Sequence, residues 1–198
     1  MAKGSSTAGT ADEHERALLK LVADGSQAAY KELYLLLSRR VYAFARQMAE
    51  NAELADEITV DTMYEVWRTA SRFRGDSKVS TWILGIARFK ALMAMRSGRR
   101  HDHHDDIEDY AEVFDDGMPD MSIQLETNEM HALIHRCLER LSADHRECIH
   151  LIHFEDLTMP EVAEVLMIPE GTVKSRLSIA RKKLAACVET KQRSLAAA

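Results

Sequence analysis

The sequence contains few residues that interrupt a helix. Its 198 residues include only 8 glycines and 3 prolines. Neither residue type occurs between Gly25 and Gly75, between Pro119 and Pro160, or after Gly171. Alternating runs of β-branched residues, which are typical of strands, are also missing. Long stretches without these breakers, rich in Ala, Leu, Glu, Arg and Met, favour helices, so we predict an all-α protein.

Cysteines and long hydrophobic runs are scarce as well. No apolar run approaches the roughly 20 residues that cross a bilayer. Residues 1–11 lack the apolar segment of a secretory signal. The 3 cysteines, Cys137, Cys148 and Cys187, are odd in number and widely spaced. This pattern argues against a disulfide framework and predicts a reducing, cytoplasmic location, with Cys187 as a packed or exposed thiol.

The net charge of −6 conceals a strong pattern along the chain. Residues 72–100 carry 8 basic and 1 acidic side chains, a net charge of +7. Residues 170–198 carry 7 basic and 2 acidic side chains, a net charge of +5. Between them, residues 101–135 carry 11 acidic side chains and no Lys or Arg. Basic blocks are the usual electrostatic footprint of nucleic-acid contact, although solvated helix faces would produce the same charges.

The predicted helices fall into two groups separated by a polar segment. Residues 98–125 hold Gly98, Gly117, Pro119 and 9 of the 11 acidic side chains of the 101–135 block, which predicts a flexible, self-repelling linker. The predicted domains are a disordered N-terminus at 1–11, a helical domain at 12–97, the linker at 98–125, a second helical domain at 126–190 and a tail at 191–198.

The C-terminal group ends in the pattern of a helix-turn-helix. A short helix at 160–166 is followed by a turn at 167–169 and a longer basic helix at 170–188. In this motif the start of the second helix enters the major groove of DNA. The polar and basic residues that we predict to contact DNA there are Thr172, Lys174, Ser175, Arg176, Ser178, Arg181 and Lys182. An ordinary helical packing unit with a solvated basic helix is the alternative interpretation.

Two segments resemble one family of bacterial transcription proteins. The segment LSADHRECIHLIHFEDLTMPEVAEVLMIPEGTVKSRLSIARKKL resembles the C-terminal, −35-reading domain of extracytoplasmic-function (ECF) sigma factors. The segment ELADEITVDTMYEVWRTASRFRGDSKVSTWILGIARFKAL resembles the other domain of that family. The two segments occur in the family's order, with a family-like linker between them.

The resemblance implies a promoter-specificity subunit of RNA polymerase, which is not an enzyme and needs no cofactor. Such a protein binds the polymerase core, recognises −10 and −35 promoter elements and helps to melt the −10 region. The residues that resemble the acidic face docking on the clamp helices of the β′ subunit are Asp56, Glu57 and Asp61. The resemblance also implies a contact between the C-terminal domain and the β flap, and inhibition by an anti-sigma factor.

By the same resemblance, the loop at 73–78 and its neighbours capture an unpaired −10 base. A glycine-containing loop flanked by aromatic and cationic side chains suits binding of a flipped base and a single strand. Trp82 can stack on a base, although its helical spacing also suits packing in the core. The residues implied are Arg72, Phe73, Arg74, Gly75, Asp76, Ser77, Lys78, Trp82, Arg88 and Lys90.

The sequence departs from the family pattern at two positions. Met167 stands in the turn where the family usually has Gly, so a positive φ there would strain the backbone. Val60 replaces the polar residue that is usual in the acidic docking segment.

Two clusters of metal-ligand residue types suggest other functions. The run from His101 to Asp106 is rich in His and Asp, and Cys148, His150 and His153 lie close together. Cys148 and His150 diverge by about 200° around a helix, so they cannot share one tetrahedral zinc site easily. We therefore predict no metal. A polymerase-independent helix-turn-helix regulator and a metal-dependent hydrolase remain the alternatives to a sigma factor.

Overall fold

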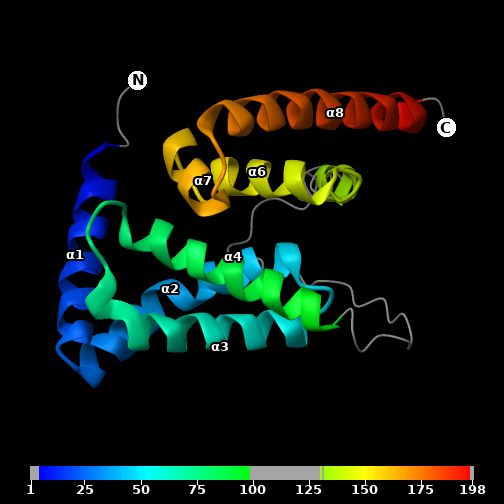
Figure 1. Cartoon of the computed structure of the whole chain (residues 1–198). Helices are drawn as coiled ribbons and strands as arrows, with labels where there is room; N and C mark the ends of the chain where they lie inside the picture. The colour runs from blue at the N-terminus through cyan, green and yellow to red at the C-terminus, as the bar shows by residue number, and fades with distance from the viewer. Residues whose placement is uncertain (1–4, 99–129, 131, 197–198) are drawn as a thin grey trace, which may run out of the picture. The chain divides into compact units, whose positions relative to one another are not determined.

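The computed structural model describes residues 5–98, 130 and 132–196, and within them every regular element is a helix. The all-α prediction is therefore confirmed for the part of the chain described. The N-terminal elements are α1 (Ser5–Ala23), α2 (Gln27–Met48), α3 (Ala52–Thr69), the 3₁₀ turn η1 (Ala70–Arg72) and α4 (Val79–Gly98). The later elements are a helix at 132–139, α6 (Ala143–His153), α7 (Met159–Leu166) and α8 (Glu170–Ala196) (Figure 1).

Side-chain caps begin two of the N-terminal helices. The Ala29 amide donates to Ser26 Oγ at 3.3 Å, and the Leu54 amide donates to Asn51 Oδ1 at 2.8 Å. Each bond satisfies one of the backbone donors that a helix start leaves without a partner. Ser142 precedes α6, and its hydroxyl pairs with His145 Nδ1 at 2.7 Å rather than with the backbone.

The contacts divide the chain into two compact units, Met1–His104 with Pro160–Ile168, and Asp105–Met159 with Pro169–Ala198. In the first unit, α2 packs against α1, α3 and α4, as the neighbouring ribbons in Figure 1 indicate. Leu33, Phe44, Met63 and Leu84 are almost completely buried there. Burial of one such side chain contributes about 1.5–3 kcal/mol to folding, so this four-helix core fixes the surfaces of α3 and α4.

In the second unit, α6 and α8 pack against each other. Their shared core consists of Leu138, Leu141, Ile149, Leu177 and Ala180. Val173, Leu177 and Ala180 are the buried side of α8 at three- and four-residue steps, which leaves the opposite side exposed. The helix extends to Ala196, beyond the predicted end near Val188.

The prediction of free thiols is wrong for two of the cysteines. Cys137, in the helix at 132–139, forms a disulfide with Cys187 of α8, with their Cα atoms 5.9 Å apart. Only Cys148 is a free thiol among the described cysteines, and it is buried. The sequence did not reveal the pair because 50 residues separate its members and packing alone brings them together.

The turn after α7 has the strained backbone that the sequence analysis anticipated. Met167 has a φ of +53°, in the left-handed region that favours glycine. The Met167 and Ile168 amides donate to the carbonyls of Glu164 and Ala163, which closes the end of α7. These backbone bonds hold Met167 in this conformation. Packing of its side chain contributes little, because the residue is 72% exposed.

Candidate nucleic-acid interface

The polar side of α8 displays most of the predicted DNA-contacting residues. Lys174, Ser175, Ser178, Arg181 and Lys182 are all exposed on it. Ser175 Oγ donates to the Thr172 carbonyl at 2.9 Å, so that hydroxyl keeps its lone pairs available. In the first part of α8 the opposite side is buried, so there the exposed polar side is available to meet another molecule.

Arg176 differs from its neighbours on this helix. Its guanidinium lies 2.7 Å from the carboxylate of Asp144 on α6, and its side chain is only 24% exposed. Burial raises the pKa of the Cys148 thiol, and the Arg176 guanidinium partly offsets that rise. In this arrangement Arg176 connects α6 to α8, so contact with a base would require exchange of its carboxylate partner.

Arg181 is also in contact with α6. Its guanidinium donates to His153 Nε2 at 3.3 Å, and both groups are exposed. A single hydrogen bond exposed to solvent is weak, so it leaves Arg181 able to approach a phosphate.

The loop at 73–78 is held by the first helix. Arg16 of α1 donates to the carbonyls of Gly75 at 3.2 Å and Ser77 at 2.6 Å. Asp12 accepts from the Arg16 guanidinium at 2.7 Å and from the Val79 amide at 3.2 Å. Gly75 has a φ of +80°, and an added Cβ would lie 3.2 Å from the Arg16 guanidinium. This network therefore requires glycine at position 75.

An aromatic pair lies at the base of this loop. The ring centroids of Phe73 and Trp82 are 5.3 Å apart, and the Arg16 guanidinium lies 5.5 Å from the Phe73 centroid. Both aromatic residues are half-buried. Cation–π and ring contacts of this kind orient the rings while part of each surface stays accessible.

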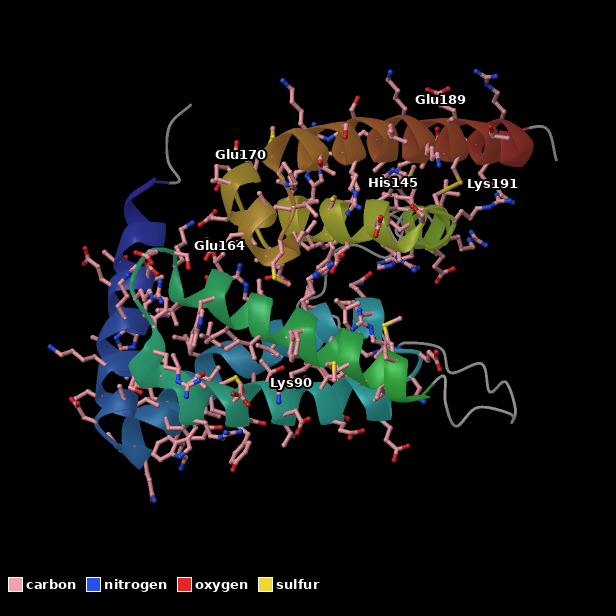
Figure 2. All side chains as sticks on the ribbon, viewed as in Figure 1. Lys90, His145, Glu164, Glu170, Glu189 and Lys191 are labelled. Atoms are coloured by element: carbon pink, nitrogen blue, oxygen red, sulfur yellow. A yellow bond between two sulfur atoms is a disulfide. The ribbon has the colours of Figure 1, made fainter. Side chains whose placement is uncertain are left out.

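The predicted cations around the loop are not equivalent. Arg72 and Arg74 are exposed, as are Gly75 and Asp76, whereas Lys78 and Arg88 are half-buried. Lys90 Nζ lies 3.4 Å from the Glu65 carboxylate, so it forms an ion pair between α4 and α3 (Figure 2). Arg72 and Arg74 are thus the most accessible positive charges of the loop.

One side of α3 is an exposed acidic stripe. Asp56, Glu57 and Asp61 lie on it and are exposed, and none is in an ion pair among the described residues. Val60 and Tyr64 lie on the same stripe and are 58% and 57% exposed. Beside it, Phe89 and Met93 of α4 are 54% and 49% exposed, over a hollow that Glu57 and Asp61 also line. This surface combines negative charge with apolar contact area.

The candidate metal ligands do not form a site in the described part of the chain. No group of three or more His, Cys, Asp or Glu side chains there is arranged to hold an ion. Cys137 is in the disulfide, and His150 lies 3.2 Å from Glu155 in a buried pair. The run from His101 to Asp106 lies outside the described residues.

Sequence reasoning missed the residues of α1 that support the loop. Asp12 and Arg16 are four residues apart, a spacing that predicts an ion pair on one helix face. This spacing does not predict that Arg16 also donates hydrogen bonds to carbonyl groups 59 and 61 residues away in the sequence. Only the packing of α1 beside η1 and α4 brings them together.

Two family models match the chain. The model of Sigma-70 region 2 matches residues 33–101, which include α3, the loop and α4. The model of Sigma-70, region 4 matches residues 131–184, which include α6, α7 and the first part of α8. No described helix is both long enough and apolar enough to span a membrane.

Relatives of known identity extend over nearly the whole chain. It is 31% identical over 172 residues to the ECF RNA polymerase sigma factor RpoE of Cereibacter sphaeroides, covering 85% of this chain and 91% of that protein. It is 28% identical to the RNA polymerase sigma-H factor of Pseudomonas aeruginosa, covering 87% and 92%.

A solved structure supports the fold. The sigma factor RpoE of Bartonella quintana, solved in complex with the anti-sigma factor NepR, matches with a TM-score of 0.64 at 24% identity. The match covers 81% of this chain and 96% of that one. The chain therefore belongs to the ECF sigma factors, the alternative sigma subunits that direct RNA polymerase to specific promoters.

Proposed function

We propose that the two parts of this sigma factor divide promoter recognition between them. Residues 12–97 bind the polymerase core and the −10 element, residues 98–125 connect the parts, and residues 126–190 bind the −35 element. The protein acts in the cytoplasm, with no catalytic activity and no cofactor of its own. The observation that carries this proposal is the exposed polar side of α8, whose other side is buried in the core.

The −35 element is read by the first turns of α8. Lys174 and Ser178 are exposed and lie one turn apart on the helix. Ser175 and Lys182 are also exposed and lie two turns apart. Lysine and serine at such positions donate to base edges and phosphates in the major groove. Thr172 and Arg181 flank this surface, and Arg176 joins it when it leaves Asp144.

The −10 element is bound at the loop that Arg16 holds. Its exposed backbone and the half-buried Phe73 and Trp82 form a platform for an unpaired base. Arg72, Arg74, Lys78, Arg88 and Lys90 supply positive charge for the phosphates of the displaced strand. Because Arg16 fixes the loop in advance, less entropy is lost when the base binds.

The polymerase core binds the acidic stripe of α3. Asp56, Glu57 and Asp61 attract a basic surface, such as that expected of the β′ clamp helices, and Val60 and Tyr64 add apolar area. The C-terminal part contacts the β flap. Since the Bartonella relative was solved with an anti-sigma factor, we also propose that a protein of that kind inhibits this chain.

Reconstituted transcription tests these assignments. Core polymerase supplemented with this protein should produce run-off transcripts from a selected promoter. Lys174→Ala should weaken the binding of the holoenzyme to that promoter by about 1–3 kcal/mol, the cost of losing a contact with a base, and so reduce the yield of transcript. Arg193→Ala is a matched control, because Arg193 is an exposed cation near the far end of the same helix. Equal transcription by both variants would refute the α8 assignment.

A second comparison isolates the core contact. Asp61→Asn should weaken association with core in the absence of DNA, whereas Glu13→Gln on α1 should not. Both residues are exposed acids, so each variant removes one negative charge. Equal affinities for core in the two variants would overturn the assignment of the α3 stripe.

A further inference from the structure

The Cys137–Cys187 disulfide borders a small hollow in the second unit. The hollow has a volume of about 240 Å³ and is lined by both cysteines together with Leu133, Arg136, Arg140 and Lys191. Cys137 is 1% exposed, whereas Cys187 is only half-buried. Figure 2 labels Lys191 on the part of α8 that carries this disulfide. Of the two cysteines, Cys187 is therefore the less buried one.

The hollow is positively charged. Arg136, Arg140 and Lys191 are exposed, and none is in an ion pair among the described residues. Arg136 lies in the helix at 132–139, Arg140 directly follows the end of that helix, and Lys191 follows Cys187 by one turn of α8. Among the residues that the structure describes, no acidic side chain lines the hollow. Three cations thus line the hollow together with Cys187, the less buried cysteine of the disulfide.

We propose that this disulfide is a thiol–disulfide exchange site for small acidic thiols of the glutathione type. Arginine pairs with carboxylates through two parallel hydrogen bonds, and lysine adds a point charge. Carboxylates bound in this way would hold the thiolate of the same molecule near Cys187. The match to the region 4 model ends at residue 184, so Cys187 and Lys191 lie outside it. The proposed exchange requires neither promoter DNA nor polymerase.

The exchange proceeds in two balanced steps. The thiolate of the first small thiol attacks Cys187 Sγ, the disulfide bond breaks, and Cys137 Sγ leaves with the electron pair and takes up a proton. A second small thiolate then attacks the small-thiol sulfur of the mixed disulfide and releases Cys187 as a thiol after protonation. Two small thiols are oxidised to their own disulfide while the protein disulfide is reduced to two thiols.

The full-length oxidised protein tests this proposal by its rate of reduction. Glutathione and glutathione diethyl ester are compared at low salt and at equal thiolate concentration, and the thiols of the protein are counted by alkylation and mass spectrometry. Glutathione should react about fivefold faster, because its carboxylates meet the cations of the hollow. The variant Arg136→Gln, Arg140→Gln, Lys191→Gln should lose this preference and keep its rate with the ester.

A control variant removes the same charge elsewhere. Lys20, Lys31 and Arg39 are exposed cations of the first unit, and their replacement by Gln should leave the preference for glutathione unchanged. Equal rates with the two thiols in the unmodified protein would overturn the proposal. A preference for glutathione that survives in the triple variant of the hollow would also overturn it. Failure of air oxidation to form the Cys137–Cys187 bond in the purified protein would overturn it as well.

Discussion

At Met167 the backbone has a φ of +53° and the side chain is 72% exposed, so the residue carries strain with little packing in return. Left-handed backbone costs about 1–2 kcal/mol for a residue with a Cβ atom. Glycine removes that cost but loses about 0.4–1 kcal/mol through its more flexible unfolded state. The net effect at this position should favour glycine.

We therefore expect Met167→Gly to raise the free energy of unfolding by about 0.5–1 kcal/mol. Urea unfolding of the full chain, followed by circular dichroism, measures this change. Met167→Ala is the control, because alanine keeps the Cβ atom and should give no gain. A glycine variant that is less stable than the alanine variant would contradict this explanation of the turn.

Glu15 is a buried acidic residue of α1 and is only 7% exposed. Burial raises the pKa of its carboxyl group, and the neighbouring Arg40 only partly offsets the rise. Because the folded state holds the proton more tightly than the unfolded chain, stability falls as the pH rises from the unfolded pKa, near 4.5, through the higher folded pKa.

Glu15→Gln should remove this loss and stabilise the protein at pH 7. Glutamine retains an oxygen that can accept the hydrogen bond from the Ser80 backbone. Thermal unfolding at pH 4 and pH 7 measures the effect, and the variant should gain stability over the unmodified protein only at the higher pH. A loss of stability at pH 7 would show instead that the charged carboxylate, attracted by Arg40, stabilises the fold.

Among the elements, α1 supports the 73–78 loop through one side chain. Arg16→Ala would remove two hydrogen bonds to loop carbonyls and the cation beside Phe73. Hydrogen bonds from a charged donor contribute about 1.5–3 kcal/mol. We expect promoter opening, measured by permanganate reactivity of unpaired thymines, to fall on the order of tenfold. Lys20→Ala, on the same helix, should open the promoter normally, and equal opening by both variants would contradict this role.

The disulfide connects the helix at 132–139 to the end of α8. It closes a loop of 50 residues, which should stabilise the second unit by about 2–4 kcal/mol. Cys137→Ser and Cys187→Ser should each lower the free energy of unfolding by this amount relative to the oxidised protein. Chemically reduced protein should match them, and oxidised and reduced protein of equal stability would refute this prediction.

The elements show how far the sequence could predict this fold and its site. Breaker-free runs predicted the helices because helix propensity acts over a few neighbouring residues. The acidic residues Asp56, Glu57 and Asp61 were implied by the family resemblance, and the structure places them on one exposed side of α3. Arg16 with Gly75, and Cys137 with Cys187, could not be predicted, because packing of distant segments creates those contacts.

For the whole molecule, the net charge of −6 is an average over parts of opposite charge. The basic blocks at 72–100 and 170–198 carry the residues proposed to contact DNA, and the 11 acids at 101–135 separate them in sequence. Those acids should repel DNA and so limit binding in the absence of core polymerase.

Replacing acids between the basic blocks tests this idea. Asn substitutions at six positions should raise the core-independent affinity for DNA at low salt, and the gain should shrink as salt screens the charges. The positions are Asp102, Asp105, Asp106, Asp109, Asp115 and Asp116. Unchanged affinity across a salt titration, measured by fluorescence anisotropy, would rule the idea out.

The central claim is that this chain gives RNA polymerase its promoter specificity through two separate contacts. Promoter selection from a random DNA library with reconstituted holoenzyme tests it most directly. We predict enrichment of two short sequence blocks at a fixed spacing, dependent on both the core and this protein. Enrichment of the same sequences by the protein without core, or no enrichment beyond that of core alone, would contradict the account.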